Sequence, residues 1–176
     1  MITELRTERL ILKKMKVSDS SSLFKIWSNL EVTKFLNINS FTDESQAIQM
    51  IEMLDKLYQE NKAIRYSIFH LESNQIIGSC GYNTLDFENS KAEIGYEISK
   101  EYWGNGFASE AILKLLENAY NTLNFNRIEA KVEPENRNSI KLLEKLNFQF
   151  EGTLRKSEKS KDTFIDLNMY SKLKTD

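Results

Sequence analysis

The sequence predicts an α+β domain built on one mixed, mostly antiparallel sheet with helices packed on its faces. Segments in which apolar and polar side chains alternate, as in half-buried strands, recur along the chain. Other segments carry apolar residues three and four positions apart, which is the spacing of amphipathic helices. The expected order is β-α-α-β-β-β-α-β-α-β-β, and we interpret this order as a single sheet flanked by helices.

The first part of the chain is predicted to form one strand and two helices. Residues 10–12 are apolar and follow polar residues, as expected for a strand, and residues 19–29 have the pattern of a short helix behind possible serine caps. Asp43 and Gln46 have the spacing of a capping box at the start of the second helix. The apolar residues of that helix recur at helical spacing: Ala47, Ile48, Ile51, Leu54, Leu57 and Tyr58.

Three strands are predicted in the middle of the chain, at residues 66–71, 75–82 and 92–99. Residues 72–74, between the first two strands, have the composition of a short turn. The third strand alternates most clearly. Its two faces are Ala92, Ile94, Tyr96 and Ile98 on one side, and Glu93, Gly95 and Glu97 on the other.

The last part of the chain contains two predicted helices. Apolar residues at helical spacing run from Ala108 to Leu123, and a second helix starts at Asn136. Asn147 stands where a left-handed C-terminal cap is expected, and asparagine tolerates that backbone better than most residues. The remaining strands are predicted at residues 127–133, 149–156 and 163–170.

Composition and charge limit the class of protein. The 176 residues lack an internal linker or repeat, so we expect one domain over residues 1–176. A net charge of −2 argues against nucleic-acid binding, and the absence of a long apolar run argues against a membrane span. The N-terminus does not resemble a signal peptide, and Cys80 is the sole cysteine, so we expect a cytoplasmic protein. The basic run 155–161 is interpreted as a solvated hairpin tip.

Two glycines lie between a predicted strand and a predicted helix. A helix N-terminus exposes unpaired N–H groups that attract phosphate, and glycine lets the backbone approach the anion closely. Gly104 and Gly106 could therefore hold a phosphate, although two glycines also suit an ordinary turn. The spacing matches neither a dinucleotide fingerprint nor a P-loop.

The sequence around these glycines resembles the acetyl-CoA-binding motif of the GNAT acetyltransferases, [Q/R]-x-x-G-x-[G/A]. Residues 103–108, Trp-Gly-Asn-Gly-Phe-Ala, match it after the first position, where Trp103 replaces arginine or glutamine. Further segments resemble, in the same order, the branch that acetylates ribosomal-protein N-termini. These segments are Thr7–Leu12, Glu93–Tyr96, Pro134–Ser139, Leu146–Phe148, Phe150–Arg155 and Asp166–Ser171.

This resemblance implies a GNAT-like fold and assigns residues to acetyl-CoA. The backbone of Ile98 and Ser99 would hold the pantetheine arm and polarise the thioester carbonyl. Asn136 would contact the same arm, and Ser139 would lie near the sulfur. The pyrophosphate would be held by the turn and first helical residues: Trp103, Gly104, Asn105, Gly106, Phe107, Ala108 and Ser109.

Acetylation of an amine requires a base for the ammonium, a donor for the oxyanion and a hydrogen bond to the departing thiolate. Glu93, on the strand before the glycine turn, is the predicted base, directly or through water; a solvent-exposed strand glutamate is the alternative. Ser139 is predicted to hydrogen-bond to the sulfur, or else to be an ordinary first-turn serine. The family often has an acidic tyrosine where this chain has Leu143, and Tyr96 and Tyr102 are candidates only by proximity.

No metal-ligating motif occurs, so no metal is predicted. His70 is interpreted as a residue with a structural or surface role, and Cys80 as a buried, inert thiol. The predicted function is transfer of an acetyl group from acetyl-CoA to a primary amine by direct attack. The resemblance favours a protein N-terminal α-amine, with a polyamine, amino acid or aminoglycoside as an alternative acceptor. A non-catalytic acyl-CoA-binding module is the third possibility, and the protein could be a monomer or a homodimer.

Overall fold

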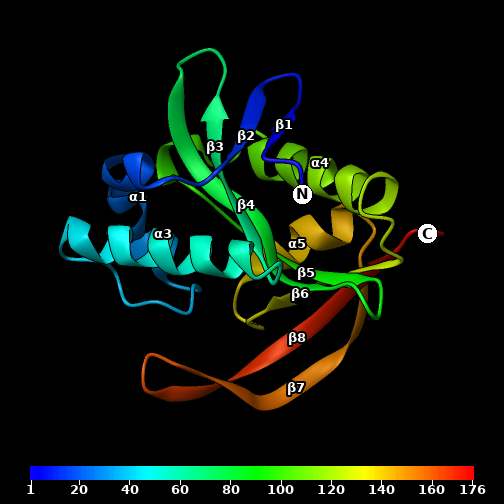
Figure 1. Cartoon of the computed structure of the whole chain (residues 1–176). Coiled ribbons are helices and arrows are strands. Elements are labelled where there is room, and N and C mark those ends of the chain that lie inside the picture. The colour runs from blue at the N-terminus through cyan, green and yellow to red at the C-terminus, as the bar shows by residue number, and fades with distance from the viewer.

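The computed structural model describes residues 1–176 and contains one eight-stranded sheet (Figure 1). The strand order is β1-β2-β3-β4-β5-β6-β8-β7. All neighbours are antiparallel except β5 and β6, which run parallel. The strands are β1 (Glu4–Arg6), β2 (Leu10–Lys14), β3 (Ile64–His70), β4 (Gln75–Asp86), β5 (Lys91–Ile98), β6 (Arg127–Val132), β7 (Gln149–Ser160) and β8 (Thr163–Leu173).

Helices cover both faces of this sheet. They are α1 (Ser20–Trp27), α2 (Leu30–Thr33), α3 (Glu44–Gln59), α4 (Phe107–Asn121) and α5 (Arg137–Lys145), with short 3-10 turns at Val17–Asp19 and Lys100–Tyr102. Helices α4 and α5 pack on one face and contribute to the main hydrophobic core of 26 buried residues. Helices α1 and α3 lie on the other face around a smaller core of seven. The predicted α+β architecture is confirmed.

Several helix ends follow from local sequence. Asp43 and Gln46 form the predicted capping box at the start of α3. Asn147 has φ +61° beyond the end of α5, as predicted for a left-handed cap. Gly106 has φ +80° immediately before α4, a conformation that an L side chain rarely adopts.

Two short elements were not predicted from the sequence. Strand β1 has three residues, of which only Leu5 is buried, so it shows no periodic pattern. It exists because β2 pairs with it. Helix α2 has four residues and is capped by the Asn29 side chain, which accepts from the N–H groups of Glu31 and Val32.

The basic run 155–161 was predicted to be a solvated hairpin tip. It forms the mostly exposed distal end of the β7–β8 hairpin, although the turn itself is shorter than the run. Strand β7 continues to Ser160, and the turn consists of Lys161 and Asp162, both with positive φ. A two-residue turn of this kind matches the twist of the flanking strands. Pairing is therefore interrupted between Leu154 and Glu158 but resumes and extends to the turn. Lys161 donates to the carbonyls of Thr33 and Lys34, which ties the tip to α2.

Cys80 is fully buried, and burial raises the pKa of its thiol to about 12, which agrees with the predicted inert role. Leu143, which stands where relatives of the predicted family often have tyrosine, is also fully buried in the main core.

None of the helices combines the length and apolarity needed to cross a membrane.

Candidate active site

The parallel pair β5 and β6 separates partway along its length. Pairing joins Lys91, Ala92 and Glu93 to Arg127, Ile128 and Glu129 and then stops, although both strands continue. The edge of β5 from Ile94 to Ile98 therefore has no neighbouring strand on the β6 side. An unpaired edge within a sheet presents N–H and C=O groups to whatever lies beside it.

The direction of these groups decides which of them is free. Ser99 donates its N–H to the carbonyl of Ile77 on the β4 side, at 2.7 Å. Because backbone groups of successive strand residues point to opposite sides, the N–H of Ile98 points away from β4 toward the open edge. The prediction is therefore corrected for Ser99, whose N–H is already used within the sheet, whereas Ile98 has the orientation that was expected.

The glycine turn lies directly after this edge and before α4. None of the backbone N–H groups from Gly104 to Ser109 donates a hydrogen bond within the protein. Gly104 and Gly106 have φ of +77° and +80°, and a Cβ at Gly104 would meet no atom within 4 Å. Free amides, left-handed glycines and the positive end of a 15-residue helix together suit an anion such as pyrophosphate.

Side chains brace this turn. The Trp103 indole donates to the carbonyl of Ile98 at 2.7 Å, and the Asn105 amide donates to the carbonyls of Tyr102 and Trp103. Phe107 is buried. Trp103 therefore fixes the turn to the end of β5 instead of offering its indole N–H to a ligand. Ala108 and Ser109 are half-buried in the first turn of α4.

His70, for which a structural or surface role was predicted, lies beside this turn. Its ring centroid is 5.0 Å from that of Phe107 and 5.7 Å from that of Tyr102. Its Nδ1 is 2.9 Å from the Ser73 hydroxyl oxygen. The edge-to-face arrangement supports a packing role for the imidazole.

Ser139 meets Tyr96 on the face of the sheet that carries α4 and α5. Their hydroxyl oxygens are 2.6 Å apart. Tyr96 lies on the part of β5 that has the open edge, and Ser139 lies in the first turn of α5. Burial raises the pKa of Tyr96 to about 12, so its hydroxyl is neutral and can donate. Asn136 caps α5 by accepting from the Ser139 N–H at 3.3 Å. From the sequence, Tyr96 was a candidate only because it is close to the motifs along the chain.

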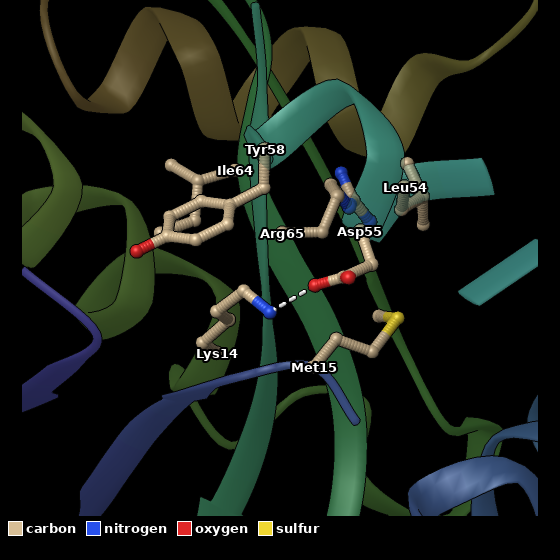
Figure 2. A pocket seen from close by; sticks show the side chains of 7 residues that line it. All are labelled: Lys14, Met15, Leu54, Asp55, Tyr58, Ile64 and Arg65. Carbon is tan, nitrogen blue, oxygen red and sulfur yellow. Dashed lines mark hydrogen bonds and ion pairs between the residues drawn. The ribbon is translucent and has the colours of Figure 1, made fainter. Parts of the chain in front are cut away.

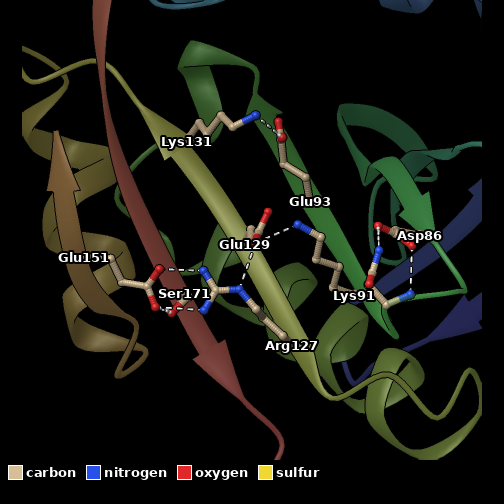
Figure 3. Close-up of polar contacts among 9 residues, drawn as sticks. Asp86, Lys91, Glu93, Arg127, Glu129, Lys131, Glu151 and Ser171 are labelled. Atoms are coloured by element: carbon tan, nitrogen blue, oxygen red, sulfur yellow. Dashed lines mark hydrogen bonds and ion pairs between the residues drawn. The ribbon is translucent and has the colours of Figure 1, made fainter. Parts of the chain in front are cut away.

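Glu93 lies on the opposite face of the sheet. Alternation along β5 places Glu93, Gly95 and Glu97 away from α4 and α5. The Oε2 of Glu93 is 2.8 Å from Nζ of Lys131 on β6, and this carboxylate holds the pKa of Lys131 above its usual value (Figure 3). The two predicted catalytic residues are therefore not neighbours: the separated strands lie between them.

The same face continues as a chain of ion pairs that joins residues of β5, β6 and β7 and crosses over β8. Arg127 binds Glu129 through Nε at 2.8 Å and Glu151 through both terminal nitrogens (Figure 3). Hydrogen bonds from Arg127 and Ser171 lower the pKa of Glu151 to about 2. Lys91 reaches Glu129 from β5 at 3.3 Å. These pairs fix β6 against its neighbours along the segment in which β5 and β6 are paired.

A buried polar cluster that the sequence did not reveal lies at the far end of this face. Glu97 accepts from the Trp27 indole at 3.0 Å, from the Arg65 guanidinium at 2.9 Å and from the Ser79 hydroxyl. The side chains of Glu97 and Arg65 are only 7% and 10% exposed. Since every oxygen of Glu97 is occupied, it positions α1 against β5 and is not available as a base.

A small cavity beneath α3 is lined by Lys14, Met15, Leu54, Asp55, Tyr58, Ile64 and Arg65 (Figure 2). Its volume is about 10 Å³, which is at the limit for a single water molecule. Lys14 and Asp55 pair with each other across it, and Lys14 lies over the Tyr58 ring. The cavity is therefore no ligand site.

A strand edge without a neighbour, followed by a turn with free amides, is the kind of site that binds an acyl group carried on a nucleotide. Comparison with protein families agrees with this class: the profile of the Acetyltransferase (GNAT) domain matches residues 9–149. The chain belongs to the GNAT acetyltransferase family and is an acetyl-CoA-dependent N-acetyltransferase.

Individual proteins similar to this chain are also named as acetyltransferases. The uncharacterized N-acetyltransferase p20 of Bacillus licheniformis is 54% identical over 97% of this chain and 96% of its own length. The ribosomal-protein-serine acetyltransferase of Escherichia coli is 27% identical over 66% of this chain and 64% of that protein. The apo structure of RimL, a ribosomal L7/L12 alpha-N-protein acetyltransferase, superposes with a TM-score of 0.89 at 21% identity, covering 98% of this chain and 95% of that one.

The predicted GNAT fold and acyltransferase class are confirmed. The narrower assignment to the ribosomal-protein branch stays a prediction. A relative at 54% identity carries no assigned acceptor, and the ribosomal-protein enzyme is related at 27%.

Proposed function

We propose that this protein transfers the acetyl group of acetyl-CoA directly to the α-amine of a protein N-terminus, where β5 leaves β6. One observation carries the proposal: the unpaired edge from Ile94 to Ile98 leads into the free amides of Gly104 to Ser109. The edge suits the amide groups of a pantetheine arm, and the turn suits a pyrophosphate. Acetyl-CoA supplies an activated acyl group with a thiol leaving group.

The residues around the edge divide the chemistry between the two faces of the sheet. On one face, Ser139 is in position to donate a hydrogen bond to the sulfur, and the Tyr96 hydroxyl orients it. At the edge itself, the Ile98 N–H is the donor that would polarise the thioester carbonyl.

On the other face, Glu93 is the proposed base for the acceptor ammonium. Lys131 engages only its Oε2 atom, and Oε1 accepts no hydrogen bond from the protein. One carboxylate oxygen is therefore available for a proton from the amine or from an intervening water. The amine would attack from the face opposite Ser139, so the nucleophile and the leaving group are separated by the strands.

An α-amine is the acceptor class that suits this base best. Its pKa of about 7.7–8.0 is well below the value of about 10.4 for lysine, so a carboxylate acting through water can suffice. The E. coli ribosomal-protein-serine acetyltransferase, although distant, supports a protein acceptor. A small amine is the second candidate, because the fold alone does not select an acceptor.

The test measures thiol release from acetyl-CoA with matched acceptors. A peptide with a free N-terminus and no lysine is compared with an N-blocked peptide that carries one lysine, beside spermidine and an aminoglycoside. We expect the free-N-terminus peptide to turn over fastest. Faster turnover of the blocked peptide or of either small amine would contradict the α-amine assignment. Binding of acetyl-CoA without turnover of any amine would indicate a binding module.

A further inference from the structure

We propose that Arg9 belongs to the acetyl-CoA site and donates hydrogen bonds from Nη2 to the pyrophosphate. The inference rests on the proposed function, which places the pyrophosphate at Gly104–Ser109. Arg9 precedes β2 by one residue and is far from the glycine turn in sequence, so motif spacing gives no reason to join them.

Three contacts fix the Arg9 guanidinium above the turn. Its Nε is 2.7 Å from Glu110 Oε2 in the first turn of α4, and its Nη1 donates to the Asn105 carbonyl at 3.0 Å. The guanidinium carbon lies 4.4 Å from the centroid of the Phe107 ring. A planar guanidinium held at two nitrogens and one face has little freedom left, so the direction of the remaining nitrogen is set.

That remaining nitrogen points into the space over the turn. Nη2 makes no hydrogen bond in the protein, and it is the one atom within 4 Å of a Cβ built on Gly106, at 3.5 Å. The free amides of the turn face the same region from the backbone side. Arginine donors and backbone amides that converge on one region are the usual composition of a phosphate site.

Glu110 explains why a cation is needed here. Burial alone would raise the pKa of its carboxyl, but hydrogen bonds from the Thr7 hydroxyl and from Arg9 outweigh burial and hold the pKa below its usual value. Glu110 is therefore ionised in the first turn of α4, where it would repel a pyrophosphate. Trp103 offers no charge to offset it, because its indole is bound to Ile98. Arg9 neutralises the carboxylate, and Glu110 is the positioning residue for Arg9.

The test compares the dissociation constants of three ligands by calorimetry: acetyl-CoA, its 3′-dephospho form and S-acetylpantetheine, which lacks the pyrophosphate. We expect Arg9→Gln to weaken both pyrophosphate ligands about 10- to 100-fold, as for loss of a hydrogen bond to a charged group, and to leave S-acetylpantetheine unchanged. Arg9→Lys should fall between. Arg6→Gln removes the same charge from exposed β1 and should bind like wild type.

Two results would overturn the assignment of Arg9 to the pyrophosphate. One is equal binding of acetyl-CoA by Arg9→Gln and wild type. The other is a penalty that disappears with the 3′-dephospho ligand, which would move Arg9 to the 3′-phosphate. If wild type itself binds acetyl-CoA no better than S-acetylpantetheine, the turn is not a phosphate site and the proposed function fails at that point.

A double variant separates direct donation from charge neutralisation. Because Glu110→Gln removes the repulsive carboxylate, Arg9→Gln with Glu110→Gln should bind acetyl-CoA more tightly than Arg9→Gln alone, yet more weakly than wild type. Full recovery would show that Arg9 acts only by neutralising Glu110 and would overturn the proposed contact. Unchanged binding of S-acetylpantetheine confirms in each variant that the rest of the site is intact.

Discussion

Replacement of Gly106 tests most directly the proposal that the glycine turn binds a pyrophosphate. Gly106 has φ +80°, and a Cβ there would face open space with only Arg9 Nη2 at 3.5 Å. Asparagine tolerates this backbone, so Gly106→Asn should fold at a cost of about 1–3 kcal/mol. Gly106→Asp has nearly the same shape and adds a carboxylate where the phosphate is expected. The comparison of aspartate with asparagine therefore isolates the charge.

The magnitude follows from the groups that the aspartate would affect. Its carboxylate is close enough to pair with Arg9, so the ligand would lose that donor and gain a like charge beside it. Hydrogen bonds to charged groups contribute about 1.5–3 kcal/mol each. With the added repulsion we expect acetyl-CoA to bind at least 100-fold more weakly to Gly106→Asp than to wild type, and Gly106→Asn to lose about 10-fold or less.

Isothermal titration calorimetry with acetyl-CoA provides the measurement, and thermal unfolding confirms that each variant is folded. Wild type should bind with a dissociation constant of roughly 1 μM to 1 mM, the range typical of enzyme ligands. Gly152→Asp is the matched control, because Gly152 on β7 also has a positive φ and open space around its Cβ position. Equal affinities of the aspartate and asparagine variants at position 106 would refute the assignment of this turn to the pyrophosphate.

Three further predictions concern the two faces of the sheet. Glu93→Gln should lower turnover about 10²–10⁴-fold with a smaller effect on acetyl-CoA affinity. Ser139→Ala should lower turnover less. Near-normal turnover and an unchanged pH–rate profile for Glu93→Gln would place the base elsewhere. Glu97→Ala should cost about 3–5 kcal/mol in denaturant unfolding because it leaves Arg65 buried without its partner, and a loss below about 1 kcal/mol would contradict this. The folded pKa of Glu151 is about 2, below its usual 4.5, so its contribution to stability is present above pH 4.5 and is lost as the pH falls toward 2. The melting-temperature gap between wild type and Glu151→Gln should therefore shrink over that range, and a constant gap would count against the ion pair.

Local sequence determined the elements and the glycine turn. Alternation along β5, the capping box of α3 and the asparagine cap after α5 each depend on residues a few positions apart, and each is confirmed. The positive φ of Gly104 and Gly106 likewise follows from a turn between a strand and a helix. Elements of three or four residues, such as β1 and α2, are too short to show a period and depend on neighbours or caps.

Tertiary structure alone decided which groups meet at the site. The register of β4 and β5 commits the Ser99 amide to Ile77, and β5 leaving β6 after Glu93 exposes the Ile98 edge. Arg9 reaches the glycine turn only because α4 packs beside β2 in the folded chain. Contacts of this kind join residues that are far apart in sequence, and the side-chain directions that make them depend on sheet register and helix packing. No local pattern encodes those two properties, so the sequence predicted the glycine turn but not the arginine above it.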